Sequence, residues 1–308
     1  MFRLITIEFE LDRSWIKRTP RDKEDTERNS FNGKSKTIPP ATCCSSGCTR
    51  ALPPGAYWLL GGSSSEDKTI TIAAVPTPHA EILNDVVKPA LEKEGYTLEV
   101  KEFTDYVLPN TATEQEEVDA NYFQHKPYLD NFNEEQGTHL VDVVGIHYEP
   151  FGLYSTKYTD LSEIPNGAKV AVPNDATNEA RALLLLEENG LIELKDDAGV
   201  TATKADITSN PKNLEIVEIE AATVPTVIDD VALAGINANY ALEGDLIDKA
   251  LVKETSDSLA AQTYANLLVV KDGNQDKEKI KALAKALTSD EVRDYINENY
   301  SGAVLTVF

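Results

Sequence analysis

One stretch of the chain gathers aromatic rings, amides and an imidazole at close spacing. Residues 119–129 read Asp-Ala-Asn-Tyr-Phe-Gln-His-Lys-Pro-Tyr-Leu and include Asn121, Phe123, His125 and Tyr128. A pocket for a small molecule needs apolar walls and a few polar anchors, and this composition supplies both. The same spacing suits the start of a helix whose aromatic rings belong to the core, so both interpretations stay open at this point.

A second cluster combines an amide with an arginine at the expected start of a helix. Asp175, Asn178 and Arg181 follow a β-branched run directly. A helix N-terminus presents free N–H groups and a positive dipole end to an anion. A guanidinium can hold a carboxylate through two parallel hydrogen bonds. The sequence therefore favours a carboxylate subsite here, and the alternative is that Arg181 is a surface residue paired with Glu187.

A third cluster places two amides behind an expected strand. Asn237 and Asn239 follow Gly235 and Ile236. One amide can accept from an ammonium group and donate to a carboxylate, so this chemistry suits a zwitterion. The alternative is that these asparagines form an ordinary turn.

Sequence signatures of enzymes are missing. There is no glycine-rich phosphate loop and no Gly-x-Ser-x-Gly motif, and residues 61–308 contain no cysteine. The histidines follow no metal-binding spacing: His79, His125, His139 and His147. We therefore expect a binding protein rather than an enzyme, without a metal and without a cofactor.

The elements that must position these clusters alternate between strand and helix patterns. Predicted strands cover residues 68–75, 97–103, 140–146, 168–172, 214–220, 232–237 and 267–270. Predicted helices cover residues 78–95 with a bend at Pro89, 174–186, 225–231, and a C-terminal pair split at Thr288, where Thr288 and Glu291 match a capping box. This alternation is typical of parallel sheets covered by helices.

The alternating pattern runs over about 240 residues, which exceeds one comfortable hydrophobic core. We therefore expect two α/β lobes, with the chain crossing over near residues 152–157 and returning near 264–270. Lobe 1 is predicted to comprise residues 68–153 and 268–308, and lobe 2 residues 154–267.

The N-terminal segment differs from the rest of the chain. All three cysteines and both tryptophans precede Gly61, and residues 13–36 are polar and of mixed charge. We expect residues 1–67 to be an extension and linker that is disordered or not native, arising from a shifted reading frame or a cloning artefact. The alternative is a genuine extension.

Charge limits the classes of partner. The chain carries 29 Lys or Arg against 52 Asp or Glu, a net charge of −23. An acidic body opposes binding to nucleic acid and adsorption to anionic lipid. No apolar run approaches the length of a membrane span. A surface adhesin would need exposed apolar or basic patches, which the sequence does not indicate.

Several long motifs in one order resemble the NlpA lipoprotein family, the methionine-binding lipoproteins of ABC importers. They are Val75–His79, Phe103–Tyr106 with Pro109–Asn110, Asp119–Leu129, His147–Ser155, Val172–Asp175 through Arg181–Leu186, Ile236–Ala241 and Gly302–Val304. The resemblance covers residues 68–308. It implies a two-lobed periplasmic-binding-protein (Venus flytrap) fold, type II-like, with the ligand cleft between the lobes.

The resemblance also implies roles for individual residues. Arg181 would hold the carboxylate of methionine, and Asn237 would anchor the ammonium or the carboxylate, with Asn178 nearby. The opposite wall, which would wrap the thioether, would be formed by Tyr106, Asn121, Phe123, His125 and Tyr128. Aromatic edges favour contacts with sulfur, which gives such a pocket a physical reason to prefer methionine.

The family further implies membrane subunits of an ABC importer as partners and an extracytoplasmic, lipid-anchored location at the cell surface. The cysteine that would carry the lipid is not readable in this sequence. The ligand alternatives are a methionine-containing dipeptide or another amino acid, and an enzyme on the same fold is the alternative of a different class.

Overall fold

The structure is a computed structural model that describes residues 68–255, 263–300 and 302–308. The extension and linker expected over residues 1–67 lie outside these ranges. Within the described ranges, no helix combines the length and the apolar character that crossing a membrane requires.

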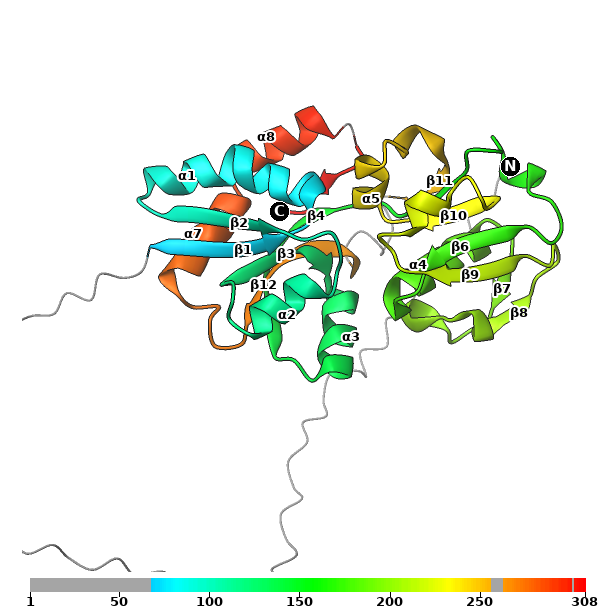
Figure 1. The fold of residues 1–308 in the computed structure, drawn as a ribbon, viewed down its shortest axis with the longest axis horizontal. Helices are drawn as coiled ribbons and strands as arrows, with labels where there is room; N and C mark the ends of the chain where they lie inside the picture. Colours follow the sequence, from blue (N-terminus) through cyan, green and yellow to red (C-terminus); the bar gives the residue numbers. More distant parts are fainter. Residues whose placement is uncertain (1–67, 256–262, 301) are drawn as a thin grey trace, which may run out of the picture. The chain divides into compact units, whose positions relative to one another are not determined.

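A six-stranded mixed sheet organises the first lobe, in the order β13-β4-β12-β3-β1-β2 (Figure 1). Its strands are β1 (Thr69–Ala74), β2 (Thr97–Glu102), β3 (Ala120–His125), β4 (Leu140–Tyr148), β12 (Ala265–Lys271) and β13 (Leu305–Thr306). Strand β1 pairs in parallel with β2 and β3, whereas β12 runs antiparallel to both β3 and β4. Strand β12 thus returns the C-terminal part of the chain to the middle of the sheet that the N-terminal part began.

Helices cover both faces of this sheet because side chains alternate along its strands. The helices are α1 (Lys88–Lys93), α2 (Leu108–Glu114), α3 (Lys126–Gln136), α7 (Glu278–Leu287) and α8 (Asp290–Asn299), and two π-helical turns precede α1 (Pro76–Ala80 and Leu83–Val87). Ile70 and Ile72 of β1 join the core formed with α1, α7 and α8, whereas Ala73 packs with Ala112 of α2 on the other face. Figure 1 shows α1 and α8 on one side of the sheet and α2 and α3 on the other.

The second lobe is built on a five-stranded sheet in the order β11-β5-β10-β6-β9. Its strands are β5 (Gly152–Tyr154), β6 (Lys169–Pro173), β9 (Glu215–Ile219), β10 (Leu233–Ile236) and β11 (Ala250–Lys253). Strand β6 pairs in parallel with β9 and β10. Strand β5 runs antiparallel to β10 and β11.

Among the described residues, two helices and a small sheet complete this lobe. The helices are α4 (Ala176–Glu188) and α5 (Ala238–Glu243), and β7 (Glu193–Leu194) pairs with β8 (Ile207–Ser209). The 3-10 turns are Leu161–Glu163, Gly199–Thr201, Lys204–Asp206, Val224–Val227 and Ile247–Lys249. Leu183 and Leu186 of α4 pack against Val170 and Val172 of β6 and Leu233 of β10. Burying each such side chain contributes about 1.5–3 kcal/mol.

The chain passes between the two sheets twice. The first crossing is residues 149–151, between β4 and β5. The second joins β11 to β12 and contains residues 256–262, which lie outside the described ranges. The sheets assign all of β5 to the second lobe and all of β12 to the first, while the boundaries expected after residues 153 and 267 run through these strands.

All seven predicted strands are present, but several details differ. The predicted C-terminal capping box is wrong: Ser289 caps α8 by accepting from the Val292 N–H, while the Thr288 hydroxyl donates to the Ala284 carbonyl oxygen one turn back in α7. The helix expected over residues 225–231 is only a 3-10 turn. Strand β3 was not predicted, because its polar and aromatic sequence lacks the alternation of apolar and polar residues that marks a half-buried strand.

Candidate functional site

A cavity lies where segments of both lobes meet. Its lining combines an aromatic wall with amides, an imidazole, a carboxylate and a guanidinium: Tyr106, Phe123, Gln124, His125, Tyr128, Glu149, Asn178, Arg181, Asn237, Ala238, Asn239 and Asn266. Seven of the eight residues predicted from the sequence line this cavity, and Asn121 does not. Their contact with a ligand remains a prediction. Glu149 and Asn266 were not predicted, and Asn239 belonged to the third cluster of the sequence without a ligand role of its own.

Asn121 lies on β3 at a place that α2 covers. Its Nδ2 donates to Asn110 Oδ1 at 3.1 Å and to Thr113 Oγ1 at 2.8 Å. Its Oδ1 accepts from Gln124 Nε2 at 2.8 Å, and the residue is fully buried. These bonds occupy the amide in attaching α2 to the sheet, so Asn121 supports the aromatic wall from behind.

The aromatic wall comes from the first lobe. The rings of Tyr106, Phe123 and Tyr128 lie with centroids between 5.7 and 6.0 Å apart. The Tyr128 hydroxyl donates to the Tyr106 carbonyl oxygen at 3.1 Å. The Tyr106 hydroxyl donates to Asn239 Oδ1 of the second lobe at 2.7 Å. Burial raises the pKa of the Tyr106 phenol well above its ordinary value, so the wall is uncharged at neutral pH.

The polar groups of the second lobe stand at the carboxyl ends of β6 and β10, where ligands bind in open α/β sheets. Asp175 caps α4 by accepting from the Asn178 N–H. Asn178 Oδ1 accepts from Asn237 Nδ2 at 2.8 Å and lies 3.2 Å from His125 Nε2. These contacts connect α4, β10 and β3 at one end of the cavity.

Gly235 of β10 allows the N-terminal ends of α4 and α5, which carry polar side chains, to approach each other. A Cβ atom at this position of β10 would lie 3.0 Å from the Ala182 Cβ and 3.1 Å from the Phe151 ring. Glycine therefore permits α4 to pack directly on β10. This close approach brings Asn178 and Arg181 beside Asn237.

Two buried atoms of the lining make no hydrogen bond with the described residues: Asn237 Oδ1 and Asn239 Nδ2. Buried polar atoms are almost always paired, because an unpaired one costs about 1–3 kcal/mol. One is an acceptor and the other a donor. Together they match a molecule that carries a donor and an acceptor close to each other.

Arg181 is buried, so the alternative of a surface pair with Glu187 is wrong. Its Nε and Nη2 bind the Glu254 carboxylate at 3.0 and 2.5 Å. Its Nη2 also donates to the Glu149 carbonyl oxygen at 3.1 Å, and the guanidinium stacks on the Tyr264 ring. Burial lowers the pKa of Arg181, but the charge and the hydrogen bonds of Glu254, with Tyr148 and Tyr264, together raise it above its ordinary value, so the guanidinium stays charged.

This arrangement changes the expected role of the arginine. The two-bond edge formed by Nε and Nη2 already holds Glu254, and Nη1 makes no hydrogen bond with the described residues. A ligand carboxylate would meet Arg181 at Nη1 rather than through the two-bond edge that the sequence suggested. Glu254 gave no signal in the sequence, because it is one of 52 acidic residues.

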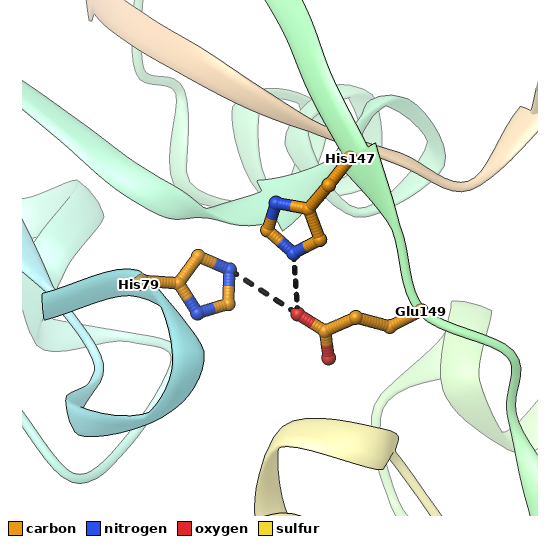
Figure 2. A group of neighbouring side chains, drawn as sticks. All are labelled: His79, His147 and Glu149. Carbon is orange, nitrogen blue, oxygen red and sulfur yellow. Dashed lines mark hydrogen bonds and ion pairs between the residues drawn. The ribbon is translucent and has the colours of Figure 1, made fainter. Parts of the chain in front are cut away.

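Glu149 lies in the first crossing between two histidines (Figure 2). Its Oε1 lies 2.6 Å from His147 Nε2 and 3.5 Å from His79 Nε2. Its Oε2 accepts from the Asn239 N–H at 2.9 Å. Sequence spacing separates the two histidines, but the fold brings them and Glu149 together, with candidate ligand atoms within 4.8 Å of one another.

Hydrogen bonds engage the ring nitrogens that face Glu149, while His79 Nδ1 makes no hydrogen bond with the described residues. His147 Nδ1 lies at hydrogen-bonding distance from the Tyr122 hydroxyl, and its Nε2 faces Glu149, so both ring nitrogens are engaged. His79 Nε2 lies 3.0 Å from Asn266 Oδ1. Burial lowers the pKa of His147 to about 3 and that of His79 to about 4, so both rings are neutral at neutral pH.

Comparison with known proteins places the fold and the site in context. The family model described as NlpA lipoprotein matches residues 70–308. The chain belongs to the NlpA lipoprotein family. The resemblance noted in the sequence is thus confirmed.

Relatives of this NlpA lipoprotein are named for methionine. The methionine-binding lipoprotein MetQ of Bacillus subtilis is 41% identical over 250 residues, which cover 80% of this chain and 90% of the relative. The D-methionine-binding lipoprotein MetQ of Escherichia coli K12 is 39% identical over 258 residues, covering 82% and 93%.

Solved structures agree with the fold described above. A nutrient binding protein from Burkholderia cenocepacia bound to methionine has 42% identity and a TM-score of 0.74, covering 78% of this chain and all of that one. The expected two-lobed binding-protein fold is therefore confirmed.

Proposed function

We propose that this NlpA lipoprotein captures methionine outside the cytoplasmic membrane and delivers it to an ABC importer. The names of its relatives support the ligand. A structural relative from Coxiella burnetii, with 38% identity, is described as a periplasmic substrate-binding protein of an ABC transporter, which supports the transport role. These relatives are named as binding proteins, which supports action by binding and not by catalysis.

The observation that carries the proposal is the unpaired acceptor and donor in one buried cavity. Asn237 Oδ1 and the Glu149 carboxylate suit the ammonium group of an amino acid. Asn239 Nδ2 and Arg181 suit its carboxylate, Arg181 through Nη1. Each zwitterion charge then meets groups of the opposite kind, which a buried charge requires.

The aromatic wall supplies the side-chain specificity. Tyr106, Phe123 and Tyr128 would surround the thioether, where sulfur–ring contacts contribute about 0.3–1.5 kcal/mol each. Binding of the ligand by both lobes would favour the closed form, and that form would dock on the importer's membrane subunits. The location follows from this role: extracytoplasmic, at the cell surface, with attachment to the membrane through a lipid anchor.

Isothermal titration calorimetry on the full chain tests the proposal, after unfolding and refolding to remove any copurified ligand. L-methionine, D-methionine, a methionine-containing dipeptide and L-isoleucine are the probes. We expect the tightest binding for methionine. Tighter binding of the dipeptide or of isoleucine would show that methionine is not the preferred ligand. Chemical conversion of a probe would support an enzyme on this fold.

The Arg181→Ala variant tests the proposed site. Loss of the charged partner should weaken methionine binding by about 2–5 kcal/mol. Methioninol, which lacks the carboxylate, is the matched probe, and its affinity should change far less. Equal losses for both molecules would show that Arg181 does not meet the carboxylate.

A further inference from the structure

We infer that the buried pair Tyr122 and His147 selects ligands with a protonated α-amine, by holding Glu149 as an oriented carboxylate at the cavity. This inference rests on the proposed binding of an amino acid. It assigns a positioning role to two residues that do not line the cavity.

The geometry forms a continuous chain from the core to the cavity. Tyr122 on β3 and His147 on β4 are fully buried, and the Tyr122 hydroxyl meets His147 Nδ1. His147 Nε2 meets Glu149 Oε1 at 2.6 Å. Figure 2 shows the His147 ring directed at the Glu149 carboxylate. Only Glu149, the last member, reaches the cavity lining.

The direction of the hydrogen bonds follows from the groups involved. When the Tyr122 hydroxyl donates to Nδ1, the neutral imidazole carries its proton on Nε2 and donates to Glu149. Glu149 is then an anion with Oε1 bonded to His147 and Oε2 bonded to the Asn239 N–H. An anion fixed in this way stands ready to receive an ammonium group.

A second proton arrangement is available to the same chain. One added proton on Glu149 would donate to Nε2, and the imidazole proton would move to Nδ1 and face the Tyr122 oxygen. The carboxyl group would then be neutral and would lose its attraction for an ammonium group. Binding an ammonium ion therefore requires release of this proton to solvent.

Groups from several elements around Glu149 contribute to the balance between these two arrangements, including the phenols of Tyr106, Tyr122 and Tyr154. His79 approaches from the π-helical turn at Pro76–Ala80, Arg181 from α4, the Asn239 N–H from α5 and His147 from β4. Burial raises the pKa of Glu149, while His79, the Asn239 N–H and Arg181 lower it. The protonated arrangement therefore gains population as the pH falls.

The experiment compares two ligands that differ only in the amine. They are L-methionine and 4-(methylthio)butanoate, which keeps the thioether and the carboxylate. In His147→Leu we expect methionine affinity to fall about 10- to 100-fold, the range for losing a hydrogen bond to a charged group. The affinity for the analogue should stay within about twofold of the wild-type value.

Further variants keep the test decisive. Tyr122→Phe keeps the ring in the core but removes the hydroxyl that donates to His147 Nδ1. The pH below which methionine affinity falls should therefore differ from that of the wild-type chain. His147→Gln retains an N–H at the end of its side chain and should recover part of the lost affinity. His139→Gln is the matched control, since the His139 side chain is 74% exposed.

The outcomes separate this inference from the proposed function. Equal losses for methionine and the analogue in folded His147→Leu, or an unchanged pH dependence in Tyr122→Phe, would overturn the positioning role while methionine binding stands. Failure of the wild-type chain to bind methionine would overturn the proposed function itself.

Discussion

The Glu254 carboxylate and the Arg181 guanidinium form a buried two-bond ion pair at the start of the second crossing, with Nε at 3.0 Å and Nη2 at 2.5 Å from its oxygens. The same carboxylate accepts from the Phe151 N–H at 2.9 Å and from the Tyr148 hydroxyl at 2.7 Å. One side chain thus connects the first crossing, the end of β4 and the arginine of the cavity. Burial raises the pKa of Glu254, but the Arg181 charge and the hydrogen bonds from Arg181, the Phe151 N–H and the Tyr148 hydroxyl together lower it below its ordinary value, so the pair is ionised at neutral pH.

Glu254→Gln should lower the free energy of unfolding by about 3–5 kcal/mol, because it leaves the buried guanidinium without a counter-charge. Chemical denaturation at neutral pH measures this change. Glu94→Gln is the control, since Glu94 pairs with Lys285 where both side chains are exposed, and its loss should be below about 1 kcal/mol. Equal effects of the two substitutions would contradict the stabilising role of the pair.

Tyr106→Phe should weaken methionine binding about two- to tenfold by removing the hydrogen bond from Tyr106 to Asn239, which joins the lobes across the cavity. The loss should appear mainly as faster dissociation, measured by stopped-flow fluorescence. Tyr295→Phe removes a similar bond, to Asp85, far from the cavity. If methionine dissociates from the Tyr106 variant as slowly as from the Tyr295 variant, this bond does not hold the lobes closed on the ligand.

Asn121→Ala should reduce stability without reducing affinity. The substitution leaves Thr113 and Asn110 without their amide partner, at a cost of about 1–3 kcal/mol in the free energy of unfolding. Calorimetric melting and titration with methionine measure the two effects separately. A large loss of methionine affinity with an unchanged melting temperature would instead support the ligand contact that the sequence suggested for Asn121.

The buried His125 should make stability depend on pH. Burial, and then the Arg181 charge, lower its pKa to about 3, below the ordinary value of 6.5. Between these values the unfolded chain binds a proton that the folded chain does not, so the stability contributed by neutral His125 is lost as the pH falls below 6.5. Each such proton contributes about 1.4 kcal/mol per pH unit.

Denaturation of the ligand-free chain between about pH 4 and 6 measures this slope. His125→Gln should make it shallower by about 1.4 kcal/mol per pH unit. A His125 variant with the wild-type slope would show that this imidazole takes up a proton in the folded state.

The sequence predicted most of the sheets and most of the cavity lining. Regular strands such as β1 and β6 carry β-branched runs, and α4 carries its own cap, so local signals were sufficient there. Asn121 does not line the cavity because its side chain bonds to Asn110 and Thr113 of α2, and the sequence does not give the position of α2 on the sheet.

The two important carboxylates could not be selected from the sequence. Glu149 follows His147 by two positions, but its second histidine neighbour, His79, lies 70 positions away in the chain. Glu254 stands in an ordinary polar stretch, and its partners come from β4, the first crossing and α4. Such residues become distinguishable only when burial and the counter-charge are known.

The first crossing is three residues long, and Glu149 is both its first residue and part of the cavity lining. Any rotation of one lobe against the other must therefore change backbone angles next to a group that faces the ligand. A substitution at residue 149 that altered ligand preference would also alter the ease of opening. Ligand recognition and ligand release therefore both depend on this residue. This limits how far substitutions at residue 149 alone can change the ligand specificity of the protein.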